Sequence, residues 1–333
     1  MKSAMLNKAF VRQEQGFEVY VLQNDNLEIS LVPDLGAKVI SLVNRCTGRQ
    51  WMNCPPGGLK LFRNGHADDF ATSTLVGWDE CLPTIAPCVH KGRSLPDHGE
   101  VWNVPWAIDR EAFNQGMLKT SVALAVSPFH FERRITLHGS EIQLGYQLEN
   151  LSEGPEHFLW SMHPLVPVHA GDALELTAES RALLGNPPWL GSLDFGITQP
   201  TYVKTYAGPL REGRAAIKNL HSGDSMTFLW DTALNHTLGV WLTRGGWNGH
   251  HHQALEPSNG WPDALANACA KNQCGLVPPR TTLVWKVTIR IEPTIATMQP
   301  NGTHVNNKHI PWAGVLTGKI PRPAIQSNIN HEK

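Results

Sequence analysis

The sequence predicts an all-β fold, on three observations. Apolar and polar residues alternate with a period of two along many short runs, which is the pattern of half-buried strands. Turn-forming residues divide these runs, and the 333-residue chain contains 29 glycines and 24 prolines. Runs with a helical period of 3.6 are scarce. Together these features are typical of a β-sandwich or β-barrel, a class in which one domain often exceeds the ~150-residue average.

The first predicted strands lie near the N-terminus, at residues 17–22, 26–32 and 37–43. A longer pair follows at residues 129–137 and 141–150, joined by a His-Gly-Ser turn that suits a hairpin. The second strand of this pair alternates most clearly. Its apolar residues, which share one face, are Ile142, Leu144, Tyr146 and Leu148, and its polar residues are Glu141, Gln143, Gln147 and Glu149.

The second half of the chain continues in the same way. Short strands are predicted at residues 157–163, 173–177, 226–230, 238–243 and 253–256. A final long strand over residues 283–292 alternates Leu, Trp, Val and Ile with polar side chains. One short helix is predicted at residues 263–270, where helix formers follow Pro262 and Asp263 serves as a cap or first-turn carboxylate.

Residues 1–293 are predicted to form a single β domain, because neither a linker nor an internal repeat interrupts them. The alternation stops at about Thr294. Turn-forming stretches follow, Pro300-Asn-Gly and Ile320-Pro-Arg-Pro. Residues 294–333 are therefore expected to be a C-terminal tail that wraps the surface or stays loose.

Charge and hydropathy exclude several classes of partner. The 28 basic and 29 acidic residues give a net charge of −1, so the chain lacks the broad basic surface of a nucleic-acid-binding protein. No apolar run reaches the ~18 residues of a membrane span, and the N-terminal stretch has no apolar core of a signal peptide. We expect a cytoplasmic protein that binds neither nucleic acid nor membrane and is a monomer or homodimer.

The six cysteines do not predict a disulfide framework, since no pair has C-x-x-C spacing in this large chain. The spacings of Cys81, Cys88, His90 and His98 match no standard structural zinc site. In His250-His251-His252, alternation would place two ligands at most on one face. The sequence therefore predicts neither a metal site nor a cofactor.

Tryptophan is unusually frequent, with 12 residues against 4 tyrosines. Its wide apolar ring and single N–H donor suit the face of a sugar, which has C–H groups on one side and hydroxyls around its rim. The alternative is that these tryptophans fill the core of a large β-sandwich.

Two ionisable residues at strand ends are candidates for acid–base chemistry. His163 ends a predicted strand and precedes a proline, so the chain leaves the sheet there, and an imidazole can act as an acid near neutral pH. Glu256 ends an apolar strand, where burial would raise its pKa towards the range of a general base. A hydrogen-bonded structural histidine and a surface glutamate are the alternatives.

The segment from Asp97 to Trp102 is a candidate binding element. In an extended chain His98, Glu100 and Trp102 share one face, which offers a donor, an acceptor and an aromatic platform. The alternative is that Asp97 and Glu100 are ordinary turn acids. The adjacent carboxylates Asp79 and Glu80 would face opposite sides of a strand, so they do not form a paired-carboxylate site.

These segments together resemble the aldose 1-epimerase (galactose mutarotase) superfamily. The resemblance begins with Val32-Pro-Asp-Leu-Gly-Ala-Lys-Val-Ile-Ser-Leu42 and continues through His98-Gly99 and the strand ending at His163. It includes Glu256-Pro257 with Pro262-Asp263 and ends in the strand containing Trp285, so it covers roughly residues 17–292. The segments that contain Asp79 and His98 depart from ordinary galactose mutarotases and look like those of a divergent branch.

The resemblance implies a mostly antiparallel β-supersandwich with an open cleft on one sheet. It implies that Glu256 is the general base, that His163 is the general acid and that His98 contacts the substrate. Trp102, Glu100 and Asp79 are further substrate-binding candidates by position. Arg63 is the nearest match to an early arginine of the family.

The predicted function is that of an isomerase of carbohydrate metabolism that interconverts sugar anomers without metal or redox cofactor. A carboxylate and an imidazole suffice, because one removes a proton from the anomeric hydroxyl while the other protonates the ring oxygen. Two alternatives stay open: a non-catalytic carbohydrate-binding protein, and a metal-dependent sugar isomerase that uses His98, His163, Glu256 and the 250–252 cluster. Lys91 and Arg93 are either contacts for an acidic sugar or solvated loop charges.

Overall fold

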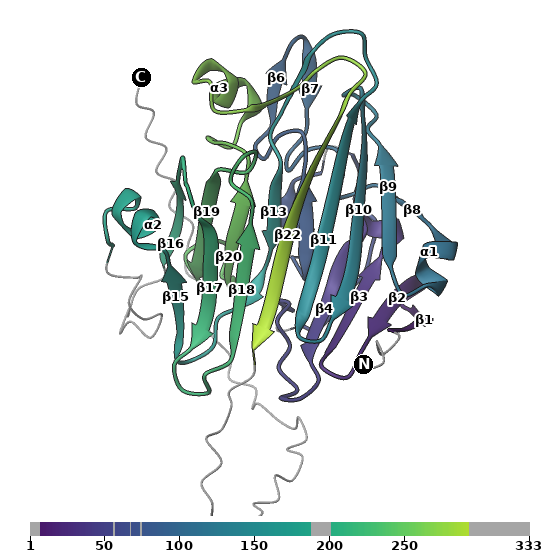
Figure 1. Cartoon of the computed structure of the whole chain (residues 1–333), viewed down its shortest axis with the longest axis vertical. Helices are drawn as coiled ribbons and strands as arrows, with labels where there is room; N and C mark the ends of the chain where they lie inside the picture. The colour runs from purple at the N-terminus through teal and green to yellow at the C-terminus, as the bar shows by residue number, and fades with distance from the viewer. Residues whose placement is uncertain (1–6, 56, 67, 74, 188–200, 293–333) are drawn as a thin grey trace, which may run out of the picture. The chain divides into compact units, whose positions relative to one another are not determined.

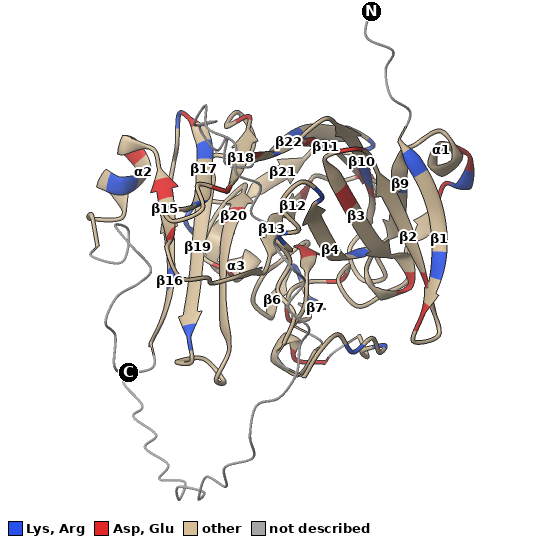
Figure 2. Ribbon diagram, turned by 90° about the horizontal axis from the view of Figure 1, so that it is seen from below, with Lys and Arg blue, Asp and Glu red and all other residues tan. Residues whose placement is uncertain are grey.

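Two large antiparallel β-sheets face each other in the computed structural model, which describes residues 7–55, 57–66, 68–73, 75–187 and 201–292. Figure 1 shows the strands running side by side, and Figure 2, seen from below, shows the sheets as two layers. The predicted all-β class and mostly antiparallel arrangement are confirmed. The tail predicted at residues 294–333 lies outside the described residues.

The first sheet has ten strands, which include the first five strands of the chain. Its order is β1-β2-β3-β4-β5-β13-β20-β19-β16, with β14 also pairing with β20. The strands are β1 (Lys8–Glu14), β2 (Phe17–Gln23), β3 (Leu27–Val32), β4 (Lys38–Asn44), β5 (Trp78–Cys81), β13 (Ser161–Pro164), β14 (Val166–Pro167), β16 (Thr201–Ala207), β19 (Thr237–Arg244) and β20 (His251–Ser258).

The second sheet has eight strands in the order β15-β17-β18-β22-β11-β10-β9-β8. Its long central strands, β10 (Phe129–His138), β11 (Glu141–Asn150) and β22 (Thr282–Glu292), match the ranges predicted from alternation. The others are β8 (Ala107–Ile108), β9 (Leu118–Ala123), β15 (Asp172–Leu176), β17 (Gly213–Asn219) and β18 (Ser225–Trp230).

Two small ribbons and three short α-helices complete the described fold. The ribbons are β6 (Cys88–His90) with β7 (Arg93–Leu95), and β12 (Glu156–Phe158) with β21 (Gly275–Val277). The helices are α1 (Arg110–Asn114), α2 (Ala178–Leu183) and α3 (Leu265–Ala270), with two 3₁₀ turns at Pro33–Leu35 and Phe70–Thr72. No described helix has the length and apolar character needed to cross a membrane.

The main core lies between the two sheets, because alternate residues of both sheets point inward. On β11 the inward residues Ile142, Leu144, Tyr146 and Leu148 are buried, as the alternation predicted. The rings of Phe131, Tyr146 and Trp285 stack across β10, β11 and β22. Several tryptophans therefore serve the core rather than a ligand: Trp51, Trp78, Trp106, Trp160 and Trp285.

A buried ion pair crosses this core. Arg133 Nη1 on β10 donates to Glu80 Oε1 on β5 at 3.0 Å, and both side chains are fully buried. Glu80 also accepts hydrogen bonds from Tyr146 Oη at 3.0 Å and from Trp160 Nε1 at 2.9 Å. A buried charge is tolerated only when it is paired and hydrogen-bonded, and here these bonds join one sheet to the other.

The predicted strand at residues 157–163 is interrupted. The chain first forms β12 in the small ribbon with β21 and then joins the ten-stranded sheet as β13. Between them the Leu159 N–H donates to the Pro83 carbonyl, and the Trp160 N–H donates to Asn259 Oδ1. Long-range partners therefore satisfy backbone groups that a continuous strand would pair within the sheet, which local alternation does not reveal.

The predicted helix begins later than its sequence suggested. The N-cap of α3 is Ala264, which makes no side-chain capping bond. The Asp263 carboxylate instead accepts a hydrogen bond from Tyr206 Oη on β16. A disulfide that the sequence did not predict, Cys269–Cys274, joins α3 to the residue before β21.

Candidate functional site

A cleft with a cavity volume of about 190 Å³, partly open to solvent, lies on the face of the ten-stranded sheet that points away from the core. Alternation positions its residues: Met162, Val240 and Leu255 point into the core, so their neighbours His163, Trp241 and Glu256 point outward. The lining residues are Phe70, Leu75, Ile85, Ala86, Asp97, His98, His163, Leu165, Lys204, Trp241, Trp247, His252 and Asp263.

The two predicted acid–base residues meet at this cleft. His163 Nε2 on β13 lies 3.7 Å from Glu256 Oε1 on β20. Residues 93 positions apart come together because β13 and β20 pair in the sheet. Both His163 Nδ1 and Glu256 Oε1 are buried without a hydrogen-bond partner in the structure, so each can still bind a ligand atom.

Lys204 on β16, which the sequence did not single out, contacts the same carboxylate. Its Nζ donates to Glu256 Oε2 at 2.7 Å, and 21% of its side chain is exposed. His163 and Lys204 line the cleft, whereas Glu256 lies behind them and is fully buried. His163 and the Lys204 side chain therefore separate the Glu256 carboxylate from the cleft.

Burial shifts the pKa values of the two acid–base residues in opposite directions. Desolvation raises the pKa of Glu256, although the Lys204 ammonium opposes that rise. Desolvation also lowers the pKa of His163 well below its ordinary value, and the neighbouring His98 and Lys204 add to the effect. Both shifts favour the uncharged forms of these groups, whereas the Lys204 ammonium favours the Glu256 carboxylate.

His98 lies beside His163, with 5.1 Å between their ring centroids. Its ring stacks on Phe70 at 4.0 Å, and its Nδ1 lies 2.9 Å from Asp97 Oδ1. The Asp97 pKa is lowered, because hydrogen bonds from His98 and from the Phe70 N–H outweigh the opposing effect of burial. These contacts hold the imidazole at the cleft wall.

Asp79 is buried on β5 directly opposite His163 in the sheet register. Its carboxylate forms an ion pair with Lys38 on β4, and burial raises its pKa despite that cation. Asp79 is not among the residues that line the cleft. Glu80 points to the opposite face, into the core, as expected for adjacent residues of a strand.

Two tryptophans form an aromatic wall that the sequence did not locate. Trp241 and Trp247 pack edge to face with their ring centroids 5.4 Å apart. Trp241 Nε1 donates to His252 Nε2 at 2.9 Å, and burial lowers the pKa of His252 to about 3. For Lys204 the sequence did contain a signal, because Tyr202, Lys204 and Tyr206 follow a period of two and therefore share one face of a strand.

Three further predicted site residues, Arg63, Glu100 and Trp102, do not line the cleft. Arg63 is exposed and forms an ion pair with Asp34 at 2.6 Å. Glu100 is buried and accepts the Val126 N–H at 2.6 Å and the Ser127 N–H at 3.1 Å, so it fixes a loop.

Trp102 is also buried, and its Nε1 donates to the Asp97 carbonyl at 2.8 Å behind the cleft wall. The expected shared face of His98, Glu100 and Trp102 does not form. His98 and Gly99 have φ of 55° and 78°, and these left-handed conformations break the alternation. At Gly99 the Leu82 carbonyl lies where a Cβ would be, so only glycine fits there.

The metal-ligating alternatives do not assemble at the cleft. Among the described residues, the three-residue group whose ligand atoms lie within 4.8 Å of one another contains His90, His157 and Cys269, and lies outside the cleft. His252 lines the cleft, but its Nε2 already accepts the Trp241 N–H. His251 is exposed.

Comparison with protein families and curated proteins finds no matching family model and no matching sequence. Solved structures do match. The Slr1438 protein from Synechocystis sp. PCC 6803 is 18% identical, with a TM-score of 0.64 over 87% of this chain and 100% of that one. A galactose mutarotase-like protein from Clostridium acetobutylicum is 12% identical, with a TM-score of 0.66 over 87% of this chain and 99% of that one.

A galactose mutarotase related enzyme from Lactobacillus acidophilus gives a TM-score of 0.58 at 12% identity, over 84% of this chain and 98% of that one. These alignments extend over nearly the whole of each matched protein. A structural match at such low sequence identity establishes a common fold but does not establish a common activity. The chain therefore has the galactose mutarotase-like β-sandwich fold in a divergent sequence.

Proposed function

We propose that this protein is a sugar mutarotase that interconverts the anomers of a reducing sugar at the cleft on the ten-stranded sheet. The observation that carries the proposal is the approach of Glu256 Oε1 to within 3.7 Å of His163 Nε2, with both atoms beside a cleft walled by tryptophan. An acid and a base that converge in this way are what ring opening requires.

In the proposed reaction Glu256 removes the proton of the anomeric hydroxyl and His163 delivers a proton to the ring oxygen. The bond between the anomeric carbon and the ring oxygen breaks, which leaves an aldehyde and a hydroxyl. Rotation of the aldehyde and closure on its other face, with the two residues in exchanged roles, produce the other anomer. Protons and electrons balance over the cycle, and the sugar is the sole reactant.

The remaining cleft residues have roles in binding. The rings of Trp241 and Trp247 suit the C–H face of a sugar, and His98 and Asp97 offer hydrogen-bonding groups for its hydroxyls. Lys204 leaves Glu256 Oε2 as the sugar enters, and the anomeric hydroxyl takes its place as the hydrogen-bond donor.

Saturation-transfer NMR on a panel of neutral and acidic reducing sugars tests this function. Faster anomer exchange in one sugar is expected, with a loss of about 10²–10⁴-fold in turnover for Glu256→Gln and for His163→Asn, and a small change in binding. Matched controls are Glu153→Gln and His138→Asn, both exposed and remote from the cleft. Unchanged turnover in Glu256→Gln would contradict the proposal.

A second candidate function is non-catalytic carbohydrate binding on the same cleft. It is favoured by the Lys204–Glu256 ion pair and by the position of Glu256 behind the lining residues. Sugar binding without accelerated exchange, unaltered by Glu256→Gln, would select this function over mutarotation. A metal-dependent isomerase would instead lose exchange after treatment with a chelator.

A further inference from the structure

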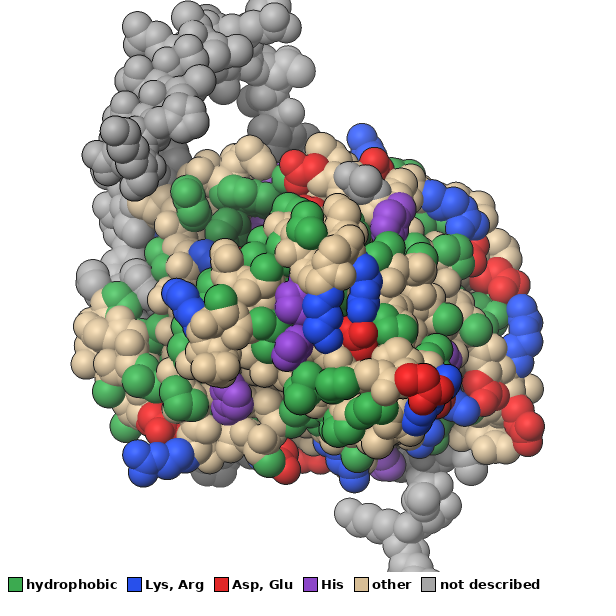
Figure 3. Space-filling view, turned by 90° about the horizontal axis from the view of Figure 1, so that it is seen from above, with side chains coloured by type: hydrophobic (Ala, Val, Ile, Leu, Met, Phe, Trp, Pro, Cys, Tyr) green, Lys and Arg blue, Asp and Glu red, His purple; other side chains and the backbone are tan. Residues whose placement is uncertain are grey.

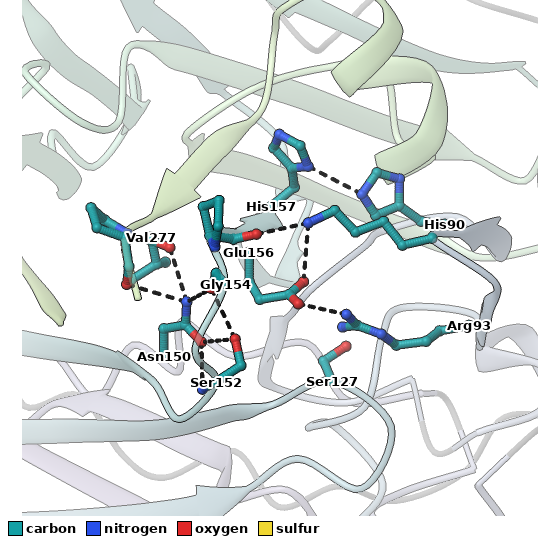
Figure 4. A network of polar contacts seen from close by, with 12 residues as sticks. His90, Arg93, Ser127, Asn150, Ser152, Gly154, Glu156, His157 and Val277 are labelled. Carbon is teal, nitrogen blue, oxygen red and sulfur yellow. Dashed lines mark hydrogen bonds and ion pairs between the residues drawn. The ribbon is translucent and has the colours of Figure 1, made fainter. Parts of the chain in front are cut away.

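A cluster of potential metal ligands lies outside the cleft. His90 on β6, His157 on β12 and Cys269 on α3 each offer a ligand atom, and these atoms lie within 4.8 Å of one another. His90 Nε2 and His157 Nδ1 are 3.3 Å apart, and Figure 4 shows the two rings directed at each other. The three residues come from segments far apart in the sequence, so the fold alone assembles them.

The spacing of this cluster suits a tetrahedral ion. Zinc bonds of about 2.0–2.1 Å to nitrogen and about 2.3 Å to sulfur place two nitrogen ligands about 3.3 Å apart, and nitrogen and sulfur about 3.6 Å apart. The two imidazole nitrogens already have this separation. Cys269 Sγ lies within 4.8 Å of each nitrogen, at most about 1.2 Å beyond the separation that zinc requires.

The cluster is half-buried and can be reached from solvent. Figure 3 looks onto the end at which α3, β6 and β7 lie in Figure 1, and shows histidines beside basic and acidic side chains. The nearby cations are already paired, since Glu156 lies 2.6 Å from Arg93 and 3.6 Å from Lys91. These two cations share the one carboxylate, so the net charge beside the cluster is +1, and zinc must bind against it through its ligand bonds.

Cys269 is held in the disulfide with Cys274. A disulfide sulfur is a poor zinc ligand, whereas the thiolate binds zinc strongly. We propose that reduction of this disulfide creates a zinc site formed by His90 Nε2, His157 Nδ1 and Cys269 Sγ, with water at the fourth position.

The step balances with a dithiol as the reductant. The dithiol transfers two electrons and two protons, its own sulfurs form a disulfide, and Cys269 and Cys274 become thiols. Zinc then displaces one proton from the Cys269 thiol. The same region is thus cross-linked by the disulfide when oxidised and by the metal when reduced.

Calorimetric titration of the full chain, without an affinity tag, tests the proposal with Zn²⁺ as the probe. The reduced protein is expected to bind one Zn²⁺ and the oxidised protein to bind none at that affinity. Cys274→Ser leaves Cys269 free, so it binds Zn²⁺ without reductant, whereas Cys269→Ser fails to bind in either state. This pair of variants separates the ligand from its disulfide partner.

Each histidine is tested in the reduced protein. His90→Gln and His157→Gln are each expected to weaken Zn²⁺ binding by more than about 100-fold, because even second-shell changes cost 10–100-fold. The exposed residues His138 and His251 supply the matched controls, His138→Gln and His251→Gln. A zinc-dependent rise in Tm gives a second readout that also verifies folding.

Three results would overturn the proposal. They are no one-to-one binding by either the reduced protein or the folded Cys274→Ser variant, full binding by Cys269→Ser, and full binding by a His90→Gln, His157→Gln double variant. None of these outcomes depends on whether the cleft acts on a sugar.

Discussion

His163 and Glu256 acquire their chemical character from the exclusion of water. Both side chains are buried beside the cleft, so desolvation lowers the pKa of the imidazole and raises that of the carboxyl group. The contact of the Lys204 ammonium with Glu256 Oε2 limits the rise of the Glu256 pKa. Under the proposed function the two groups exchange acid and base roles between ring opening and ring closure.

His252 predicts an acid-sensitive stability. Its pKa in the folded protein is about 3, against 6.5 for an unperturbed histidine, so below pH ~6.5 the unfolded state binds the extra proton. Its contribution to stability is therefore complete above that pH and falls by about 1.4 kcal/mol per pH unit as the pH decreases towards 3. Between about pH 7 and pH 5 the loss amounts to about 2 kcal/mol.

Denaturant unfolding of His252→Gln at these two pH values measures this contribution. The variant is expected to lose about 2 kcal/mol less than the wild type on acidification. His138→Gln, at an exposed residue of β10, serves as the control and should follow the wild type. Identical acid dependence in wild type and His252→Gln would contradict the burial argument.

The pairing of β19 with β20 shapes the cleft at the scale of secondary structure. Gly239 on β19 lies opposite Glu256 in the register. A Cβ added at Gly239 would lie 2.9 Å from Glu256 Oε2 and 3.2 Å from the Tyr206 ring. Glycine at this strand position therefore leaves the space that the carboxylate occupies.

Gly239→Ala is expected to displace the Glu256 carboxylate. Overpacking of this kind costs about 1–3 kcal/mol of unfolding free energy. Under the proposed function, misplacement of the base also lowers anomer exchange by up to about 100-fold. Denaturant unfolding and the NMR exchange assay measure the two effects.

Gly145→Ala on β11 is the matched control for this substitution. An added Cβ there approaches no atom more closely than 4.0 Å, so both stability and exchange should stay near wild-type values. Equal effects of the two alanine variants would show that the space beside Glu256 is unimportant.

The two sheets are joined through a polar contact as well as through the apolar core. Arg133 and Glu80 pair inside the sandwich, and burial raises the Glu80 pKa although Arg133 opposes it. Arg133 also donates to the Ala37 carbonyl, so one side chain bonds both to β5 and to the turn that precedes β4 in the facing sheet. Removing one partner leaves the other charge buried and uncompensated.

Arg133→Met is therefore expected to destabilise the whole protein by about 3–5 kcal/mol. The matched control is Arg280→Met, which removes an ion pair with Glu153 whose side chains are 59% and 82% exposed. That control should change the unfolding free energy by less than about 1 kcal/mol. Denaturant unfolding of both variants decides the matter, and a loss below 1 kcal/mol for Arg133→Met would refute the argument.

Most of the fold could be predicted from the sequence, because strand alternation is a local property. The strands at β10, β11 and β22 emerged at nearly their observed bounds. Other strands, such as β1 and β16, were missed. The interruption between β12 and β13 was also missed, because its hydrogen-bond partners Pro83 and Asn259 are distant in sequence.

The site was predictable in part. His163, Glu256 and His98 occupy strand ends and turns with a recognisable chemical character, and the structure places them together. Lys204 and Trp241 sit within ordinary strands, where nothing local distinguishes a cleft residue from a surface one. Glu100 and Arg63 were predicted as substrate contacts from their residue type and segment. In the structure Glu100 accepts a backbone N–H of a loop and Arg63 pairs with Asp34, both away from the cleft.

The sequence by itself determined the all-β class and the faces of the long strands, because a period of two depends only on neighbouring residues. The tertiary structure alone decided which ionisable groups meet, since β13 and β20 bring His163 to Glu256 while β6, β12 and α3 bring His90 and His157 to Cys269. Proximity and burial arise from strand pairing and sheet packing, and these set both proton affinities and ligand geometry.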